Sequence, residues 1–288
     1  MVEKFENWVA LLGVKGGPAI NPHGAMPTSH LLHLDGKIIV VDCGAGVTSG
    51  IAKQGVALKK IDAIFITHLH SDHYLELGPL LHTAWTSGLK HQIKIYAPKG
   101  TRDYLKHFLA SMQFDIETRM ADEGRPDLAS LISLEELEQA DLVFSDGIKV
   151  KAIRNKHPPL IDSFALRFDG SESSVVFSGD TAFYPPLADF ARGVNLLVHE
   201  AMFPAGIDRL VARVGNGDGR LRHHMFASHT PIADAGRIAA MAGVGALAIN
   251  HMVPIDDPMI SPQDWTDAAR LHWHGPLYIG VDGLRIAL

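Results

Sequence analysis

The stretch Thr67-His68-Leu69-His70-Ser71-Asp72-His73 brings three imidazoles and one carboxylate into six residues, His68 to His73, directly after a mostly apolar run. That run predicts a buried strand. His68 and His70 stand two residues apart, so in extended backbone their side chains point the same way and can bind one metal ion. Asp72 and His73 lie on the following turn and would face a second ion. Two ions held about 3.5–4 Å apart can generate hydroxide at neutral pH, so the stretch predicts a hydrolytic centre.

A polar turn that happens to contain histidines is the alternative interpretation, and for a lone histidine it would be favoured. Four potential ligands in this packed arrangement favour the metal site. The pattern His-x-His-x-Asp-His resembles the signature of the metallo-β-lactamase superfamily. The resemblance implies an α/β protein with a four-layer αβ/βα sandwich.

Three further candidate ligands each come just after a predicted strand. They are His157 after 148–154, Asp180 after 175–178, and His251 after 246–250. The carboxyl ends of strands are where α/β proteins assemble their sites. The resemblance implies how these residues divide: His68, His70 and His157 bind one metal, Asp72, His73 and His251 bind the other, and Asp180 bridges both.

The turn Asp42-Cys43-Gly44 resembles a turn that lies beneath the metal site in the superfamily, where the aspartate orients neighbouring ligands. As a nucleotide-binding loop it would lack the full Gly-x-Gly-x-x-Gly spacing.

Two motifs narrow the resemblance to the ribonuclease Z and arylsulfatase-like branch. His199-Glu200-Ala201 and Ser228-His229-Thr230 are similar to that branch's elements in order and in spacing from His251. In the branch, a glutamate orients a histidine that protonates the leaving group. The resemblance therefore implies catalytic roles for Glu200 and His229, and Asp72 is assigned as a catalytic residue as well as a metal ligand. General acids contribute typically about 10²–10⁴ in rate.

Periodicity and turn residues predict the remaining elements. A hairpin is expected at Asp35-Gly36, because this dipeptide between two apolar runs is a strong turn signal. Thr230 is expected to cap a helix that has Pro231 at its first position and closes at Gly243. A terminal hairpin is expected over 276–288. The other expected strands are 8–14, 61–67, 93–97, 163–168 and 196–199, and the other expected helices are 47–54, 74–87, 101–112 and 265–273.

The stretch 113–147 stands apart by charge. It holds ten acidic residues against only Arg119 and Arg125, and Ser133 with Glu136 predicts a capping box that starts a short helix. We expect a solvated insertion or lid within a single domain spanning 1–288.

Composition restricts the partners. A net charge of −6 and the acidic stretch disfavour nucleic acid as a partner, whereas ribonuclease Z carries a basic, glycine-rich arm that binds transfer RNA.

The single cysteine, Cys43, excludes an internal disulfide and fits a reducing compartment. The first residues carry acids where a secretory signal needs bases, and no run of 18 apolar residues occurs, so we expect a cytoplasmic enzyme without membrane contact. A homodimer is compatible with this interpretation.

Apolar residues near the motifs predict either a substrate pocket or plain core: Phe183, Tyr184, Met202, Phe203, Met225 and Phe226. His223 and His224 are expected either in this pocket or on a solvent-facing turn, and the sequence favours neither position. The other histidines have no ligand spacing and are expected to be structural or exposed: His23, His30, His33, His82, His91, His107, His272 and His274.

The sequence therefore predicts a dinuclear metal-dependent hydrolase that uses a metal-bound hydroxide on an ester-type bond of a small molecule, such as a sulfate, phosphodiester or lactone. Two divalent ions are expected. Zinc suits histidine and carboxylate ligands without cysteine best, with manganese or iron as alternatives. The competing functions are transfer RNA 3′ processing, an iron-dependent oxidoreductase and a non-catalytic scaffold. A scaffold would be expected to lose ligands, whereas all seven are present.

Overall fold

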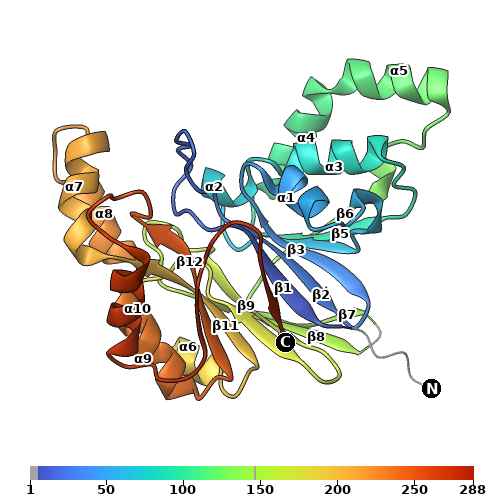
Figure 1. Ribbon diagram of the computed structural model, residues 1–288. Helices are drawn as coiled ribbons and strands as arrows, with labels where there is room; N and C mark the ends of the chain where they lie inside the picture. The colour runs from blue at the N-terminus through green and yellow to red at the C-terminus, as the bar shows by residue number, and fades with distance from the viewer. Residues whose placement is uncertain (1–5, 146) are drawn as a thin grey trace.

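The computed structural model describes residues 6–145 and 147–288 and contains two seven-stranded sheets packed face to face (Figure 1). The first has the order β14-β1-β2-β3-β4-β5-β6 and the second β13-β12-β11-β10-β9-β8-β7. The first sheet consists of β1 (Trp8–Gly13), β2 (Ser29–Leu34), β3 (Lys37–Cys43), β4 (Ala63–Phe65), β5 (Ile93–Ala97), β6 (Ile132–Glu136) and β14 (Leu284–Ala287). The second consists of β7 (Ala140–Ser145), β8 (Ile148–Arg154), β9 (Phe164–Asp169), β10 (Ser174–Phe177), β11 (Leu196–Met202), β12 (Ala246–Val253) and β13 (Leu277–Ile279).

Helices cover the outer face of each sheet (Figure 1). On the first sheet lie α1 (Val47–Lys53), α3 (Leu77–Thr86) and α4 (Thr101–Ser111), with α5 (Gln113–Glu123) outside them against α4. On the second sheet lie α6 (Pro186–Phe190), α9 (Ile232–Ala242) and α10 (Pro262–Arg270). The remaining helices are α2 (Ser71–Tyr74), α7 (Pro204–Val214), α8 (Arg220–Ser228) and the 3₁₀ turns 58–60 and 129–131. The expected αβ/βα sandwich is confirmed.

The central strands are apolar on both faces because each sheet is covered twice. Along β1, Trp8, Ala10 and Leu12 pack in the core beneath the helices, while Val9 and Leu11 pack in the core between the two sheets. Alternate residues of a strand point to opposite faces, so one continuous apolar run supplies both cores.

Each sheet combines antiparallel and parallel strands in the same sequence. An antiparallel meander, β1-β2-β3 or β7-β8-β9-β10, is followed by parallel strands reached through crossovers. The chain therefore repeats one pattern in its two halves. Segments leaving strands of both sheets meet at one end of the sandwich, where the candidate ligands gather.

The hairpin at Asp35-Gly36 is confirmed, and both turn residues have positive φ, 48° and 77°. The predicted hairpin over 276–288 is wrong. Its two strands separate: β13 pairs in parallel with β12, while β14 pairs antiparallel with β1 in the other sheet. A local turn signal cannot distinguish a hairpin from a chain that crosses between sheets.

Two further local predictions are corrected. Ser133 and Glu136 lie in β6, which pairs in parallel with β5, so they form no helix cap. Helix α9 begins at Ile232 with Pro231 as its cap residue, so Thr230 is not the cap; instead its hydroxyl donates to the Thr181 carbonyl at 2.6 Å. In both cases long-range pairing overrides a local preference.

The acidic stretch 113–147 forms α5 and the edge strands β6 and β7, so much of it belongs to the sandwich. A role for it as a lid stays a prediction. Residues 1–5, which include most of the acidic N-terminal segment, and Asp146 lie outside the described residues. Among the described helices, none is both long enough and apolar enough to cross a membrane.

Candidate metal centre and active site

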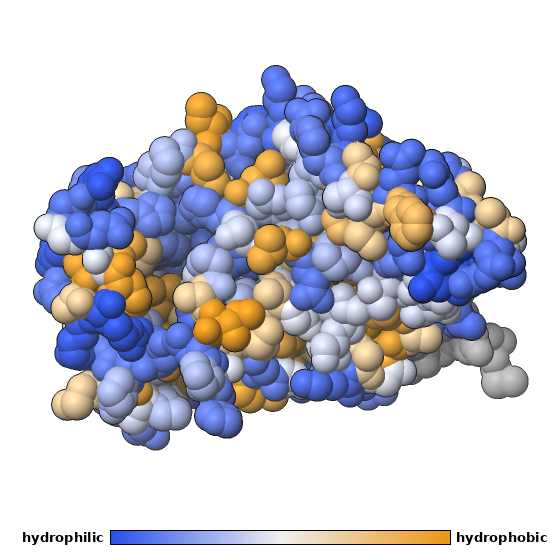
Figure 2. Space-filling model, turned by 90° about the horizontal axis from the view of Figure 1, so that it is seen from above, coloured by the Kyte–Doolittle hydropathy of each residue, from blue (hydrophilic) through white to orange (hydrophobic). Residues whose placement is uncertain are grey.

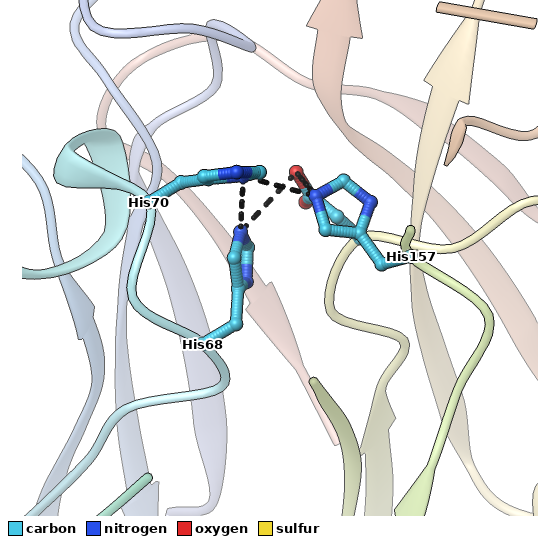
Figure 3. Close-up of side chains that lie close together, drawn as sticks. His68, His70 and His157 are labelled. Carbon is cyan, nitrogen blue, oxygen red and sulfur yellow. Dashed lines mark hydrogen bonds and ion pairs between the residues drawn. The ribbon is translucent and has the colours of Figure 1, made fainter. Parts of the chain in front are cut away.

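His68, His70 and His157 point toward one another from two different sheets (Figure 3). The Nδ1 atom of His70 lies 3.2 Å from Nε2 of His68 and 3.0 Å from Nε2 of His157. Oδ2 of Asp180 lies 3.7 Å from His68 Nε2 and 3.9 Å from His157 Nε2. The first predicted ligand group is thus assembled around one point.

The second predicted group meets beside it. Asp72 Oδ2 lies 3.6 Å from Nε2 of His73 and 3.3 Å from Nε2 of His251. Asp180 Oδ2 lies 3.4 Å from His73 Nε2 and 3.0 Å from His251 Nε2. The Asp180 carboxylate therefore stands between the two groups, in the position expected for a bridging ligand.

Two β-bulges aim side chains at the centre. Asp42 in β3 and His251 in β12 are the extra residues where the registers shift, and both have positive φ, 63° and 41°. We expected His251 to follow the end of its strand, but β12 continues beyond it to Val253. Bulges commonly re-aim a side chain next to an active site, and a positive φ in a residue other than glycine marks a conformation held by its surroundings.

Hydrogen bonds on the far side of the rings fix which nitrogen faces the centre. His73 Nδ1 donates to Asp42 Oδ2 at 2.8 Å, and Asp42 also accepts from the Thr67 backbone N–H at 2.8 Å. His157 Nδ1 donates to the Ser228 carbonyl at 2.9 Å. Such outer contacts are typical of metal-binding histidines because they hold the tautomer and the ring orientation.

The donor set fits divalent metal ions. Ligands of a tetrahedral zinc ion lie about 3.3–3.4 Å apart when each bond is about 2.0–2.1 Å, close to the spacings of both groups. His73 Nε2 and Asp180 Oδ1 are buried without a hydrogen-bond partner among the described residues, which is costly unless an ion satisfies them. Burial alone would raise the pKa of Asp180, but His251, His73 and His68 outweigh it and hold that pKa well below its usual value.

Glu200 and His229 form a buried pair next to the predicted metal ligands. His229 Nδ1 lies 3.2 Å from Glu200 Oε1, which also accepts the backbone N–H groups of Thr181 and Thr230 at 2.9 and 3.2 Å. Burial lowers the pKa of His229 to about 4, against the opposing effect of Asp180. Burial also raises the pKa of Glu200, and Asp180 acts in the same direction. His229 is therefore uncharged at neutral pH, and its Nε2 atom is left for the pocket that it lines.

A pocket of about 670 Å³ opens over the centre and contacts His70, Asp72, Asp180, His229 and His251. Figure 2 views this end of the molecule from above and shows it hollowed, with hydrophobic residues around the hollow. One wall comes from α7 and α8 through Leu210, Val214, Leu221 and Met225. The opposite wall comes from the loop after β1.

Of the apolar residues proposed for the pocket, only Met225 lines it. Phe183, Tyr184 and Phe203 pack against the core on the outer face of the second sheet, Met202 is buried in a smaller cluster, and Phe226 is exposed. His224 lines the pocket, whereas His223 on the same helix is exposed. Proximity in sequence placed these residues near the motifs without fixing the side on which they lie.

Sequence reasoning missed Lys15, Arg213 and the α7 wall, all of which line the pocket. A signal existed for α7, because Pro204 stands at its first position and Gly215 at its C-cap. Lys15 is a lone cation between a strand and two glycines, and nothing in its local pattern connects it with the metal motif.

Comparison with known proteins gives consistent results. The family model described as anti-Pycsar protein Apyc1 matches residues 10–230. Ribonuclease Z of Mycobacterium sp. (strain KMS) is 31% identical over 284 residues, covering 96% of this chain and 95% of that protein. Ribonuclease Z of Mycobacterium marinum is 29% identical over 283 residues, covering 96% and 97%.

Solved structures share the fold. The metallo-β-lactamase fold protein YhfI from Bacillus subtilis superposes with a TM-score of 0.72 at 21% identity, covering 99% of this chain and 100% of that one. The short form of human tRNase Z superposes with a TM-score of 0.67 at 21% identity, covering 97% of this chain and 98% of that one. A diphosphatase of the PhnP family gives 0.66 at 17% identity, covering 98% of each chain.

Proposed function

Because the chain belongs to the ribonuclease Z-like hydrolases of the metallo-β-lactamase superfamily, and to the family described as anti-Pycsar protein Apyc1, we propose that it is a metal-dependent phosphodiesterase. The observation that carries the proposal is the convergence of seven donor residues beneath a pocket that also contains the Glu200–His229 pair. Relatives and structural neighbours whose names specify phosphoester or diphosphate bonds support phosphorus over sulfur or carbonyl centres.

In this proposal His68, His70 and His157 would hold one divalent ion, Asp72, His73 and His251 would hold the other, and Asp180 would serve both. Zinc suits these nitrogen and oxygen donors, and the absence of cysteine among them leaves manganese and iron as alternatives. When bound, the two ions would lower the pKa of water and stabilise negative charge on the phosphoryl oxygens.

The chain's own contribution to leaving-group departure comes from Glu200 and His229. A proton donated from His229 Nε2 to the leaving oxygen is replaced at Nδ1, 3.2 Å from Glu200 Oε1. The raised pKa of Glu200 supports this carboxyl as the proton source. Proton donation of this kind matters most for poor leaving groups such as alkoxides.

The pocket supports a small substrate. A volume of about 670 Å³ lies within the range of roughly 300–1,000 Å³ that is usual for small-molecule sites. Arg213, which lines the pocket, is already paired with Asp256 at 2.8 Å, and Arg209 on the same helix is paired with Asp257 at 2.7 Å. An organic group beside the phosphate would pack against the apolar wall of α7 and α8.

Transfer RNA 3′ processing is the second candidate, and the names of the curated relatives favour it. Those names count against our expectation that nucleic acid is a disfavoured partner. The acidic helix α5 counts against RNA binding, because its one arginine, Arg119, is paired with Asp115 and Glu123.

One experiment on metal-reconstituted protein distinguishes the two candidate functions. Chromogenic phosphodiesters, aryl sulfates, lactones and carboxylic esters are assayed beside a precursor transfer RNA with a 3′ extension. We expect hydrolysis of the phosphodiesters, abolished by chelation and restored by zinc or manganese. Preference for the transfer RNA by 100-fold or more in kcat/KM would establish the second candidate, and activity confined to sulfates or lactones would reject both.

A further inference from the structure

Lys15 is a buried cation on the wall of the candidate active site. Only 8% of the residue is exposed, yet it lines the same pocket as Asp72, Asp180 and His251. Its backbone N–H donates to the Met26 carbonyl at 2.9 Å, and the next N–H, of Gly16, donates to the Met252 carbonyl at 3.2 Å. Because Met252 follows His251, these bonds hold Lys15 at a fixed place beside a predicted metal ligand.

Protein groups leave the Lys15 ammonium incompletely satisfied. Its one hydrogen bond among the described residues goes to the adjacent Gly16 carbonyl at 3.2 Å, although an ammonium has three donors. The nearby carboxylates have other partners: Asp256 binds Arg213 at 2.8 Å and also Asn21, and Asp72 accepts the Gly17 N–H at 2.8 Å. Burial lowers the pKa of Lys15, while Asp256 and Asp72 oppose that shift.

Two structural explanations fit less well. A lysine that only covers apolar surface keeps its charged end in water, but this residue is almost fully buried. A lysine that only balances carboxylates is unnecessary once the metals are bound. With Glu200 protonated, as the proposed mechanism requires, Asp42, Asp72 and Asp180 total −3, and two divalent ions would total +4. The Lys15 charge is therefore not needed to balance these carboxylates and is left to face an anionic substrate.

We propose that Lys15 donates to a non-bridging phosphoryl oxygen of the substrate and so makes the site selective for anionic phosphodiesters over neutral esters. This inference rests on the proposed phosphodiesterase function. A hydrogen bond from a charged donor is worth about 1.5–3 kcal/mol, which corresponds to roughly 10-fold to 100-fold in binding.

The test compares two substrates that differ in charge at the same phosphorus: bis(4-nitrophenyl) phosphate, an anion, and its methyl ester, a neutral triester. Lys15→Met keeps the apolar stem and removes the charge, Lys15→Arg keeps a charge, and Lys53→Met on the exposed face of α1 is the matched control. We expect Lys15→Met to lower kcat/KM roughly 10-fold to 100-fold on the diester and less than 3-fold on the triester. Metal content should be unchanged, and Lys15→Arg should recover part of the loss.

Calorimetry with phenyl phosphate on the metal-loaded protein gives a readout independent of turnover, and we expect Lys15→Met to weaken binding at least 10-fold. In the wild-type protein, phenyl phosphate should protect Lys15, and not Lys53, from acetylation, a measurement that needs no folded variant. Equal losses on both substrates, a loss of metal or an absence of protection would overturn the inference while leaving phosphodiester hydrolysis in place. A wild-type protein that cleaves no phosphodiester would overturn the proposed function, and this inference with it.

Discussion

Nδ1 of His73 donates to Oδ2 of Asp42 at 2.8 Å, and this contact turns Nε2 of His73 toward Asp72 and Asp180. Both side chains are about 99% buried, at 1% exposure each. Asp42 reaches this position because it is the bulged residue of β3, with a φ of 63°. One strand irregularity thus orients a predicted ligand that lies 31 residues further along the chain.

Replacing Asp42 with asparagine should weaken metal binding by about 10-fold to 100-fold, because the neutral amide no longer increases the basicity of His73. Competition with a chromophoric chelator measures the affinity. Asp62→Asn is the matched control, since Asp62 accepts the Ile38 N–H at 2.8 Å and is only half-buried. Equal metal affinity in the wild type and Asp42→Asn would show that the contact serves folding alone.

We expect about two metal ions per chain. Asp180→Ala should weaken the binding of both ions and abolish activity. The reason is that Oδ2 of Asp180 faces both ligand groups, 3.7 Å from His68 Nε2 and 3.0 Å from His251 Nε2. Elemental analysis after reconstitution gives the stoichiometry. Asp169→Ala, which removes the carboxylate partner of Arg167 away from the centre, serves as the control. Loss of a single ion with activity retained would remove Asp180 from the bridging position.

His229→Ala should cost little on nitrophenyl esters and about 10²–10⁴ on esters of aliphatic alcohols, because only poor leaving groups require a proton. Glu200→Gln should show the same pattern more mildly, since glutamine keeps a partner for Nδ1 but supplies no proton. His223→Ala, an exposed neighbour on α8, is the control.

The leaving-group dependence also distinguishes the other roles open to His229. Its ring lies in one cluster with Asp180 and His251, so it has the surroundings of a ligand as well. A uniform loss on all substrates would indicate substrate binding or support of the fold. Loss of metal would make His229 a ligand.

Gly16→Ala should disturb the metal centre without replacing a predicted ligand. An added Cβ would lie 2.7 Å from Cε1 of His251 and 2.2 Å from Cγ2 of Val253, so His251 must move. We expect a loss of about 1–3 kcal/mol in the free energy of unfolding, together with weaker metal binding. Gly219→Ala is the matched control, because no atom lies within 4 Å of its added Cβ and its φ is −80°. Denaturant titration without metal measures the loss in the free energy of unfolding, and the smaller gain in stability on adding metal measures the weaker metal binding.

Precursor transfer RNA should bind weakly at physiological salt, because α5 is acidic and the arginines near the pocket are engaged in ion pairs. Filter binding across a salt series measures the affinity and its slope. Tight, strongly salt-dependent binding followed by cleavage at the 3′ side would reverse the order of the two candidate functions.

Much of the fold and of the site could be read from the sequence. The apolar runs of β1 and β3 predict their strands, since residues buried on both faces leave little ambiguity. The candidate ligands stand out in the sequence because histidines and aspartates clustered at strand ends are unusual enough to indicate a site, and the structure brings them together. Local signals failed at Ser133 and Thr230, where strand pairing and a long-range hydrogen bond replaced the expected caps.

The sequence by itself determined which side chains are available for the metal centre, because donor type and strand order are local properties. Only the tertiary structure decided the bulges that aim Asp42 and His251, the division of β13 and β14 between two sheets, and the position of Lys15 beside Met252. Each of these depends on pairing between segments that are separate in sequence, in the last case by more than 200 residues. Their geometry follows from how the two sheets pack, which no local preference encodes.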